Sequence, residues 1–342
     1  MRPLTPTLER FIRPEVLQMT PYTPIKPFHI LSRELGIPAD QLVKLDANEN
    51  PYGMSPRALA AVQALGATIP VYPDPASVDL RGALATQLGV ALESVVVGSG
   101  ADELIELLFR LCVEPEDRIL NCPPTFSMYS FFNAIIGARE VVVERDAGFG
   151  LDLAAIEAAA LDHAPKVIFV AAPNNPDASD LPAGALERLL RLDALVVLDE
   201  AYREYATRPD FPDALPTLRQ GRANVIMLRT FAKLHGLAGL RIGYAFGHPD
   251  VIAYLDRTRN PFNVNALAQV AARAALEDED HIRATLAHAR ESRAYFEREL
   301  AALGLEAAPS ETNFICINVG DDAAVADGLH ERGFTVTALT NW

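Results

Sequence analysis

The chain has 342 residues, of which 50% are apolar and 22% are charged, and its formal net charge is −15. The length suggests about two domains, and the composition is that of a globular protein with material for a large core. The negative excess repels polyanions at long range, so neither nucleic acid nor an anionic membrane is an expected partner.

No apolar run approaches the roughly 18 residues of a membrane span, and no apolar core of a signal peptide follows Met1. The three cysteines, Cys112, Cys122 and Cys316, are widely spaced and form no Cys-x-x-Cys motif. This pattern argues against a disulfide framework and against a zinc site, and it fits a reducing compartment. We therefore expect a cytoplasmic protein without a metal centre.

The N-terminal residues 1–45 are rich in proline and show weak periodicity. They predict an arm that packs with a small domain. Residues 46–265 predict a large α/β domain, because short runs rich in Val and Ile alternate there with helical patterns such as 153–164 and 182–192. Such runs are typical of strands buried on both faces of a mostly parallel sheet. Seven runs qualify: 94–98, 118–122, 140–144, 166–171, 194–199, 224–229 and 242–246.

The pattern changes after Asn265, where residues 265–303 are rich in Ala, Glu and Arg with helical periodicity. A predicted strand (313–319), a helix (321–332) and a short strand (334–339) follow. Residues 266–342 therefore predict a smaller α+β domain.

Ligands bind at the carboxyl ends of the strands in open α/β sheets, so the residues just past each run are candidates. After the first run, Gly100, Ala101 and Asp102 stand at a strand-to-helix turn, where backbone N–H groups can bind a phosphate. A dinucleotide fingerprint is disfavoured, because Glu103 stands in place of its third glycine. A plain helix cap by Asp102 is the remaining alternative.

An aspartate, Asp199, ends the fifth run, and Tyr202 follows three residues later. A carboxylate at the end of a buried strand is costly unless it is paired. A protonated pyridine nitrogen, a metal or an arginine would each serve as the partner. Tyr202 can point into the same crevice.

A lysine, Lys233, follows the sixth run and is one of only four, with Lys26, Lys44 and Lys166. A desolvated lysine is nucleophilic and suits Schiff-base chemistry. Arg241 lies eight residues further, across a glycine-rich segment, and can bind a phosphate. The alternative for both side chains is an ordinary surface position.

After the fourth run comes a predicted turn at Asn174 and Asn175, before Pro176. Asn174 fits a purely structural role in that turn. Asn175 can in addition donate its amide to a ligand oxygen.

Taken together, these segments resemble the fold-type-I pyridoxal-phosphate (PLP) enzymes, in particular the histidinol-phosphate aminotransferase family. The matching pieces occur in the family's order: DANENPYG (46–53), YPD (72–74), GSGADE (98–103), PTFSMY (124–129), PNNP (173–176), DEAY (199–202), RTFAK (229–233), GLAGLRIGY (236–244) and PFNVN (261–265).

The resemblance implies a PLP-dependent transaminase of histidine biosynthesis, with histidinol phosphate and 2-oxoglutarate as the pair. Lys233 would carry PLP as a Schiff base and move the proton, and Asp199 would hold the pyridine nitrogen protonated. Asn175 and Tyr202 would hydrogen-bond the ring oxygen, and Phe126 would stack on the ring. The phosphate would be bound by Gly100, Ala101, Asp102, Thr230 and Arg241.

The resemblance also implies a homodimer with shared active sites, in which Tyr72 reaches the phosphate of the neighbouring subunit. Tyr22 falls where the family contacts the substrate's phosphate end. Asn48, or an arginine of the arm such as Arg13, is the candidate for the substrate carboxylate.

Several positions depart from the family pattern: Ile25, Asp177, Ala178, Ala232 and Thr337. The family also continues past the equivalent of Trp342 into a strand with a carboxylate-binding arginine, so the small domain is expected to be cut short. Three alternatives therefore stay open beside histidinol-phosphate transamination: transamination of aromatic amino acids, decarboxylation of a phosphorylated amino acid, and a truncated, weakly active PLP-binding homologue.

Overall fold

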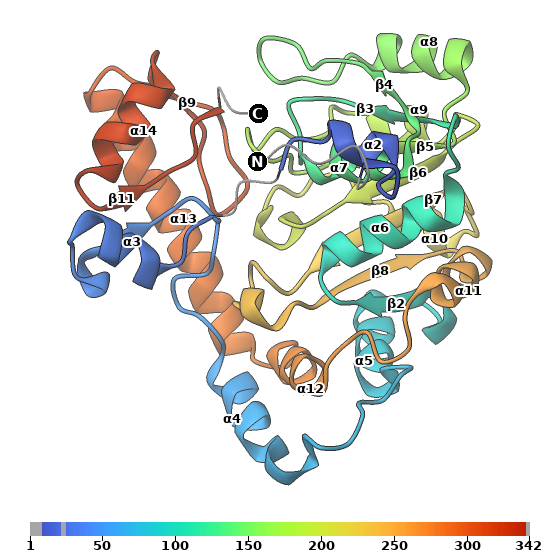
Figure 1. Ribbon diagram of the computed structural model, residues 1–342, viewed down its shortest axis with the longest axis horizontal. Coiled ribbons are helices and arrows are strands. Elements are labelled where there is room, and N and C mark those ends of the chain that lie inside the picture. Colours follow the sequence, from blue (N-terminus) through green and yellow to red (C-terminus); the bar gives the residue numbers. More distant parts are fainter. Residues whose placement is uncertain (1–8, 22–24, 340–342) are drawn as a thin grey trace.

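The computed structural model describes residues 9–21 and 25–339 (Figure 1). Its central sheet has seven strands in the order β2-β8-β7-β6-β5-β3-β4. Strand β8 runs antiparallel to β2 and β7, and the other neighbours pair in parallel. The expected α/β fold with a mostly parallel seven-stranded sheet is confirmed. The strands are β2 (Val95–Gly98), β3 (Arg118–Asn121), β4 (Arg139–Val142), β5 (Val167–Ala171), β6 (Leu195–Asp199), β7 (Val225–Thr230) and β8 (Gly243–Gly247).

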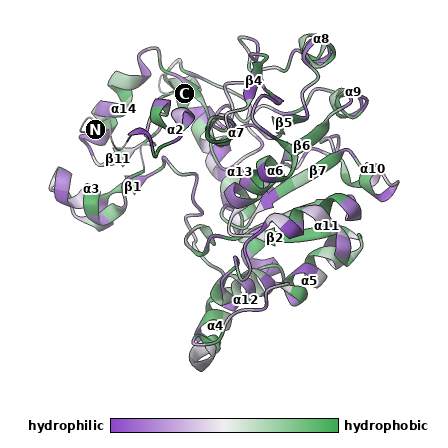
Figure 2. Ribbon diagram, turned by 45° about the vertical axis from the view of Figure 1, so that its right-hand side comes forward, coloured by the Kyte–Doolittle hydropathy of each residue, from purple (hydrophilic) through white to green (hydrophobic). Residues whose placement is uncertain are grey.

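Both faces of the sheet are buried, which explains why its strands are almost continuously apolar. In β5, Val167 and Phe169 face one hydrophobic cluster, and Ile168 and Val170 face the other. Figure 2 shows β6 and β7 in the colours of hydrophobic residues. The first cluster is covered by α6 (Ala101–Cys112), α7 (Met128–Ile136) and α11 (Pro249–Thr258), and the second by α5 (Val78–Leu88), α8 (Leu153–His163), α9 (Ala185–Leu189) and α12 (Ala266–Ala275).

A smaller α+β part stands beside the sheet (Figure 1). It contains the long helix α13 (Glu279–Ala302), α14 (Asp322–His330) and the antiparallel pair β9 (Glu306–Ala307) and β10 (Ile317–Asn318). From the N-terminal side, β1 (Val43–Lys44) pairs in parallel with β11 (Phe334–Thr335). The other elements are α2 (Pro14–Gln18), α3 (Phe28–Leu35), α4 (Pro56–Leu65), α10 (Leu215–Arg219) and the 3-10 turns η1 (Ala39–Gln41), η2 (Gly66–Thr68), η3 (Leu92–Ser94), η4 (Arg203–Tyr205) and η5 (Ala238–Leu240).

The two strands predicted near the C-terminal end are much shorter than expected. Before β10, Ser310 accepts from the backbone N–H of Thr312 (3.1 Å), and the Thr312 hydroxyl donates to the Phe314 carbonyl (2.9 Å). Such local bonds between side chain and backbone compete with a sheet ladder. The boundaries of the expected arm, large domain and small domain stay predictions.

Across the part of the chain that the structure describes, no helix combines the length and the apolar character that crossing a bilayer requires.

Candidate active site

Lys233 lies on the loop after β7, at the carboxyl edge of the sheet. Its Nζ donates to the carbonyl of Ala47 (2.8 Å) and lies 5.6 Å from the ring centroid of Tyr202. The loop is anchored by the fully buried Phe231 and by the Thr230 hydroxyl, which accepts from the Ala232 N–H (3.0 Å). The structure thus brings the predicted lysine and tyrosine together.

Asn48 lies on the same side of the site. Its Nδ2 donates to the Tyr202 hydroxyl (3.1 Å), and its carbonyl accepts from Nδ2 of Asn313 (2.9 Å). The Tyr202 ring is held edge-on by Phe314, with 4.9 Å between the centroids. Asn48 has a φ of 51°, a conformation that asparagine tolerates better than most residues. A polar cluster therefore joins the lysine loop to the segment before α4.

Asp199 ends β6 and is buried. Its Oδ2 accepts from the Tyr129 hydroxyl (2.7 Å), and its Oδ1 accepts from the Ala201 N–H (3.1 Å). Burial raises the pKa of Asp199 to about 6, although both hydrogen bonds act in the opposite direction. Among the described residues, no lysine, arginine or histidine forms an ion pair with Asp199. A positively charged ligand atom would supply the ion-pair partner that Asp199 lacks.

Tyr129 was missed as a site residue from the sequence. It is fully buried on α7, its ring stacks on Phe169 (4.8 Å between centroids), and Phe126 meets it edge-on at 5.7 Å. Burial and the nearby Asp199 raise the pKa of Tyr129 well above its ordinary value, so its hydroxyl stays a donor. Its position three residues after the predicted Phe126, in the same motif, was the available signal.

The turn after β2 has the features of a phosphate-binding turn. Gly100 has a φ of +86°, and the helix α6 that follows carries no side-chain cap. A Cβ added to Gly100 would lie 2.8 Å from Nη2 of Arg241, and a Cβ added to Gly243 would lie 2.7 Å from the backbone nitrogen of Ala101. Glycines therefore let strand, turn and arginine approach one another. The amide groups of the first turn of α6 are free of side-chain caps, as anion binding at a helix N-terminus requires.

Asp102 does not cap α6. Its carboxylate instead pairs with Nη2 of Arg241 (2.9 Å), which excludes the plain-cap alternative. Thr230 pairs with Gly243 across β7 and β8, and this pairing sets it beside the turn. Residues expected at a phosphate are thus gathered from three places: the β2–α6 turn, the end of β7 at Thr230, and Arg241 directly after η5.

The two asparagines after β5 differ in their surroundings. Asn174 is buried, accepts from the Thr125 hydroxyl (2.7 Å) and donates to Asp177 (2.5 Å) and the Pro124 carbonyl (3.0 Å). The half-buried side chain of Asn175 has no hydrogen-bond partner within residues 9–21 and 25–339. Its amide is therefore available to a ligand.

Four residues named from the sequence make none of the contacts described above. Tyr22 lies outside the described residues. Tyr72 is 78% exposed and stacks on Phe262 (4.6 Å between centroids). Arg13 donates to the carbonyl of Ile136 (3.1 Å). The Thr337 hydroxyl donates to the carbonyl of Asp46 (3.3 Å), so it lies near the segment that carries Asn48.

These groups fit PLP. The amine of Lys233 suits the aldehyde of that molecule, and the buried carboxylate of Asp199 suits its pyridine nitrogen. The uncapped N-terminus of α6 beside Arg241 suits the phosphate, and the free amide of Asn175 suits the ring oxygen.

Comparison with known proteins decides the family. The sequence model of aminotransferase class I and II matches residues 40–341. The chain belongs to this family. The histidinol-phosphate aminotransferase of Roseiflexus castenholzii is 43% identical over 335 residues, which are 95% of this chain and 89% of that protein. The family expected from the motifs is confirmed.

Solved structures of the family agree. Histidinol-phosphate aminotransferase from Sinorhizobium meliloti, in complex with pyridoxal-5'-phosphate, has a TM-score of 0.84 and 31% identity, covering 95% of this chain and 88% of that one. Aspartate aminotransferase from Thermus thermophilus with maleate has a TM-score of 0.79 and 25% identity, covering 96% and 92%. The aminotransferase fold therefore accommodates more than one amino donor, and the fold alone does not select the substrate.

Proposed function

We propose that this protein is a PLP-dependent transaminase that exchanges the amino group between histidinol phosphate and 2-oxoglutarate. The observation that carries the proposal is the convergence of Lys233, Asp199 and Tyr202 with the β2–α6 turn at one edge of the sheet. Relatives named histidinol-phosphate aminotransferase, at 43% identity, support the choice of substrate.

When bound, PLP supplies an electrophilic carbon and a pyridine ring that withdraws electrons. The Nζ of Lys233 would then serve twice, as the amine that holds the cofactor and as the base that takes the proton from the substrate's Cα. The carbonyl of Ala47, which accepts from Nζ, orients the lysine toward Tyr202.

Asp199 would keep a proton on the pyridine nitrogen. Its carboxylate is buried and is aligned by Tyr129 and by the Ala201 N–H. A charge-assisted hydrogen bond in such surroundings is stronger than one in water. Tyr202 and Asn175 would hydrogen-bond the ring oxygen, and Phe126 would pack against the ring. Thr230, Arg241 and the turn of Gly100, Ala101 and Asp102 would bind the phosphate, with the amides of Ala101 and Asp102 as the backbone donors.

The half-reaction with each amino donor tests this function. The PLP-loaded protein is mixed with histidinol phosphate, and the cofactor's absorbance is followed as it converts to the amine form. We expect histidinol phosphate to convert the cofactor to the amine form, and 2-oxoglutarate to return the original absorbance. Conversion with phenylalanine or tyrosine should be slower. Release of carbon dioxide with unchanged cofactor, or no conversion with any donor, would contradict the proposal.

We also propose a homodimer in which Tyr72 serves the site of the partner subunit. The segment between η2 and α5 exposes three large apolar side chains: Ile69 (53%), Val71 (69%) and Tyr72 (78%). Exposed clusters of this kind are typical of interfaces. Among the described residues, Phe262 is the one aromatic side chain that stacks on the Tyr72 ring.

Mixed dimers test the shared site. One chain carries Tyr72→Phe and the other carries Lys233→Ala, so that only one site per dimer keeps its lysine. If Tyr72 acts across the interface, that site retains near-normal activity per lysine. Activity as low as that of the Tyr72→Phe homodimer would show that Tyr72 acts within its own chain.

A further inference from the structure

Glu103 places a carboxylate directly against the turn that is proposed to bind the cofactor phosphate. Its Oε2 accepts from the backbone N–H of Ser99 (2.5 Å) and from Nδ2 of Asn263 (2.7 Å). A Cβ on Gly98 would lie 3.1 Å from the same oxygen. Glu103 is the third residue of α6, so the contact resembles a capping box in which the side chain reaches back to the preceding turn.

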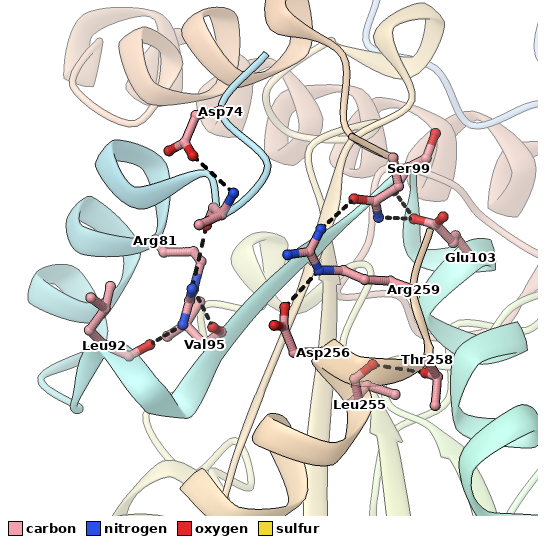
Figure 3. A network of polar contacts seen from close by, with 12 residues as sticks. Asp74, Arg81, Leu92, Val95, Ser99, Glu103, Leu255, Asp256, Thr258 and Arg259 are labelled. Atoms are coloured by element: carbon pink, nitrogen blue, oxygen red, sulfur yellow. Dashed lines mark hydrogen bonds and ion pairs between the residues drawn. The ribbon is translucent and has the colours of Figure 1, made fainter. Parts of the chain in front are cut away.

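Asn263 is fixed from its other side by Arg259. Its Oδ1 accepts from Nη1 of Arg259 (3.2 Å), and Nε of Arg259 pairs with Asp256 (2.6 Å). Figure 3 shows Ser99, Glu103, Asp256 and Arg259 in this network. Because the amide lies between a carboxylate and a guanidinium, only one orientation satisfies both neighbours. The Arg259 side chain is only 11% exposed, so the guanidinium that holds the Asn263 amide is largely shielded from solvent.

This network has two consequences for the turn. The Ser99 N–H is engaged by Glu103, and the Gly100 N–H donates to the Gly98 carbonyl (2.8 Å), so the turn presents to a phosphate the amides that follow, those of Ala101 and Asp102. The backbone path from β2 into α6 is tied through Glu103 to Asn263, 160 residues away along the chain, and Asn263 is held by Arg259 at the end of α11.

We propose that Glu103 and Asn263 are positioning residues for the cofactor phosphate, which act by fixing the Gly98–Ala101 turn rather than by touching the phosphate. This inference rests on the proposed PLP chemistry. The expected effect of removing Glu103 on PLP affinity is opposite to the effect of charge alone. A carboxylate near a phosphate repels it, so electrostatics alone predicts that removing Glu103 tightens PLP binding. Positioning predicts that removing it weakens PLP binding.

Equilibrium binding of PLP and of pyridoxal to the apoproteins separates the two effects, because pyridoxal lacks the phosphate but keeps the aldehyde and the ring. The variants are Glu103→Ala, Glu103→Gln and Asn263→Ala. Glu106→Ala is the matched control, since Glu106 lies on the same helix in an exposed pair with Arg110.

We expect Glu103→Ala to raise the dissociation constant of PLP about tenfold, which corresponds to about 1.4 kcal/mol. Glu103→Gln, whose amide oxygen can still accept both bonds, and Asn263→Ala should raise it about threefold. Pyridoxal affinity should change less than twofold, and Glu106→Ala should change neither ligand.

Unchanged or tighter PLP binding by Glu103→Ala would overturn the inference. If this variant loses both ligands, Glu103→Gln and Asn263→Ala decide, and an equal loss of PLP and pyridoxal there would also overturn it. These outcomes leave the proposed function intact. A wild-type protein that binds neither ligand would refute the proposed function itself.

Discussion

The proposed cofactor side and the proposed substrate side of the candidate site differ in the structure that supports them. Asp199 and Thr230 end buried strands, Lys233 follows one, and the phosphate turn leaves another. On the substrate side, Asn48 lies on an irregular segment, supported by the side chain of Asn313 and, at its neighbour Asp46, by Thr337. The pairs β1–β11 and β9–β10 beside it are only two residues long.

The difference teaches where rigidity is placed in this molecule. A strand end in a sheet buried on both faces holds its side chain through core packing, so the cofactor residues are preorganised. The substrate side depends on single hydrogen bonds between loops, which cost little to rearrange. We therefore expect substitutions on the cofactor side to affect chemistry and stability, and those on the substrate side to affect substrate binding alone.

The largest effect is expected from Asp199→Asn, which removes the charge proposed to stabilise the protonated ring. Turnover should fall about 10²–10³-fold, the range found when a preorganised electrostatic group is lost. The Michaelis constants should change only a few-fold. Steady-state kinetics provide the measurement, with Tyr129→Phe as the milder companion because it removes only the hydrogen bond to Asp199. An Asn variant with near-normal single-turnover deamination would contradict the assignment.

The same substitution should stabilise the apoprotein at alkaline pH. Because burial raises the pKa of Asp199 to about 6 from 3.8, the folded apoprotein holds a proton that the unfolded chain has already released between these pH values. Wild-type stability therefore falls as pH rises from about 4 to 6, and above pH 6 the folded state carries the full cost of the ionised carboxylate. That cost is about 2–3 kcal/mol at about 1.4 kcal/mol per pH unit.

Urea unfolding of both apoproteins at pH 5 and pH 8 measures this difference. Asp199→Asn should be the more stable protein at pH 8, and the gap should narrow at pH 5. A gap that is equal at both pH values, or a wild type that is the more stable at pH 8, would show that Asp199 is not strained by burial.

On the substrate side, Asn48→Ala should raise the Michaelis constant for the amino donor about tenfold, the value of one hydrogen bond of about 1.4 kcal/mol. PLP affinity should stay within twofold. Asn313→Ala, which removes only the support of the Asn48 carbonyl, should act in the same direction with a smaller effect. If Asn48→Ala also weakened PLP binding to a similar extent, the expected separation between substrate binding and cofactor binding would be wrong.

The smallest effect is expected at Ala178, a position next to the cofactor side where this sequence departs from the family's usual glycine. Ala178 is buried with a φ of 65°, which favours glycine. Ala178→Gly should therefore raise the free energy of unfolding by up to about 1 kcal/mol, with unchanged activity. Ala271→Gly, in the interior of α12, is the control and should destabilise the protein. Destabilisation by both would contradict the strain at residue 178.

The seven strands could be predicted because burial on both faces leaves an apolar run in the sequence. Asp199 and Lys233 could be singled out because each directly follows such a run. Tyr129 and Asn263 stand in two of the matching motifs, but their partners could not be predicted, because these contacts join positions 70 and 160 residues apart. No local pattern encodes those distances.

The strand expected at 313–319 is predicted too long for a related reason. Its apolar residues resemble those of the central strands, but Ser310 and Thr312 bond locally to the backbone and take up groups that a ladder would use. Hydrophobic pattern reports burial, and it does not report this competition.

Borohydride reduction of the protein equilibrated with PLP, followed by peptide mapping, tests the central claim most directly. The chain offers four lysines, and among them Lys233 alone is placed at the carboxyl edge of the sheet beside Tyr202. We predict a single stable cofactor adduct on the peptide that contains Lys233, and none in Lys233→Ala. An adduct on Lys26, Lys44 or Lys166 instead, or an adduct that persists in Lys233→Ala, would contradict the account.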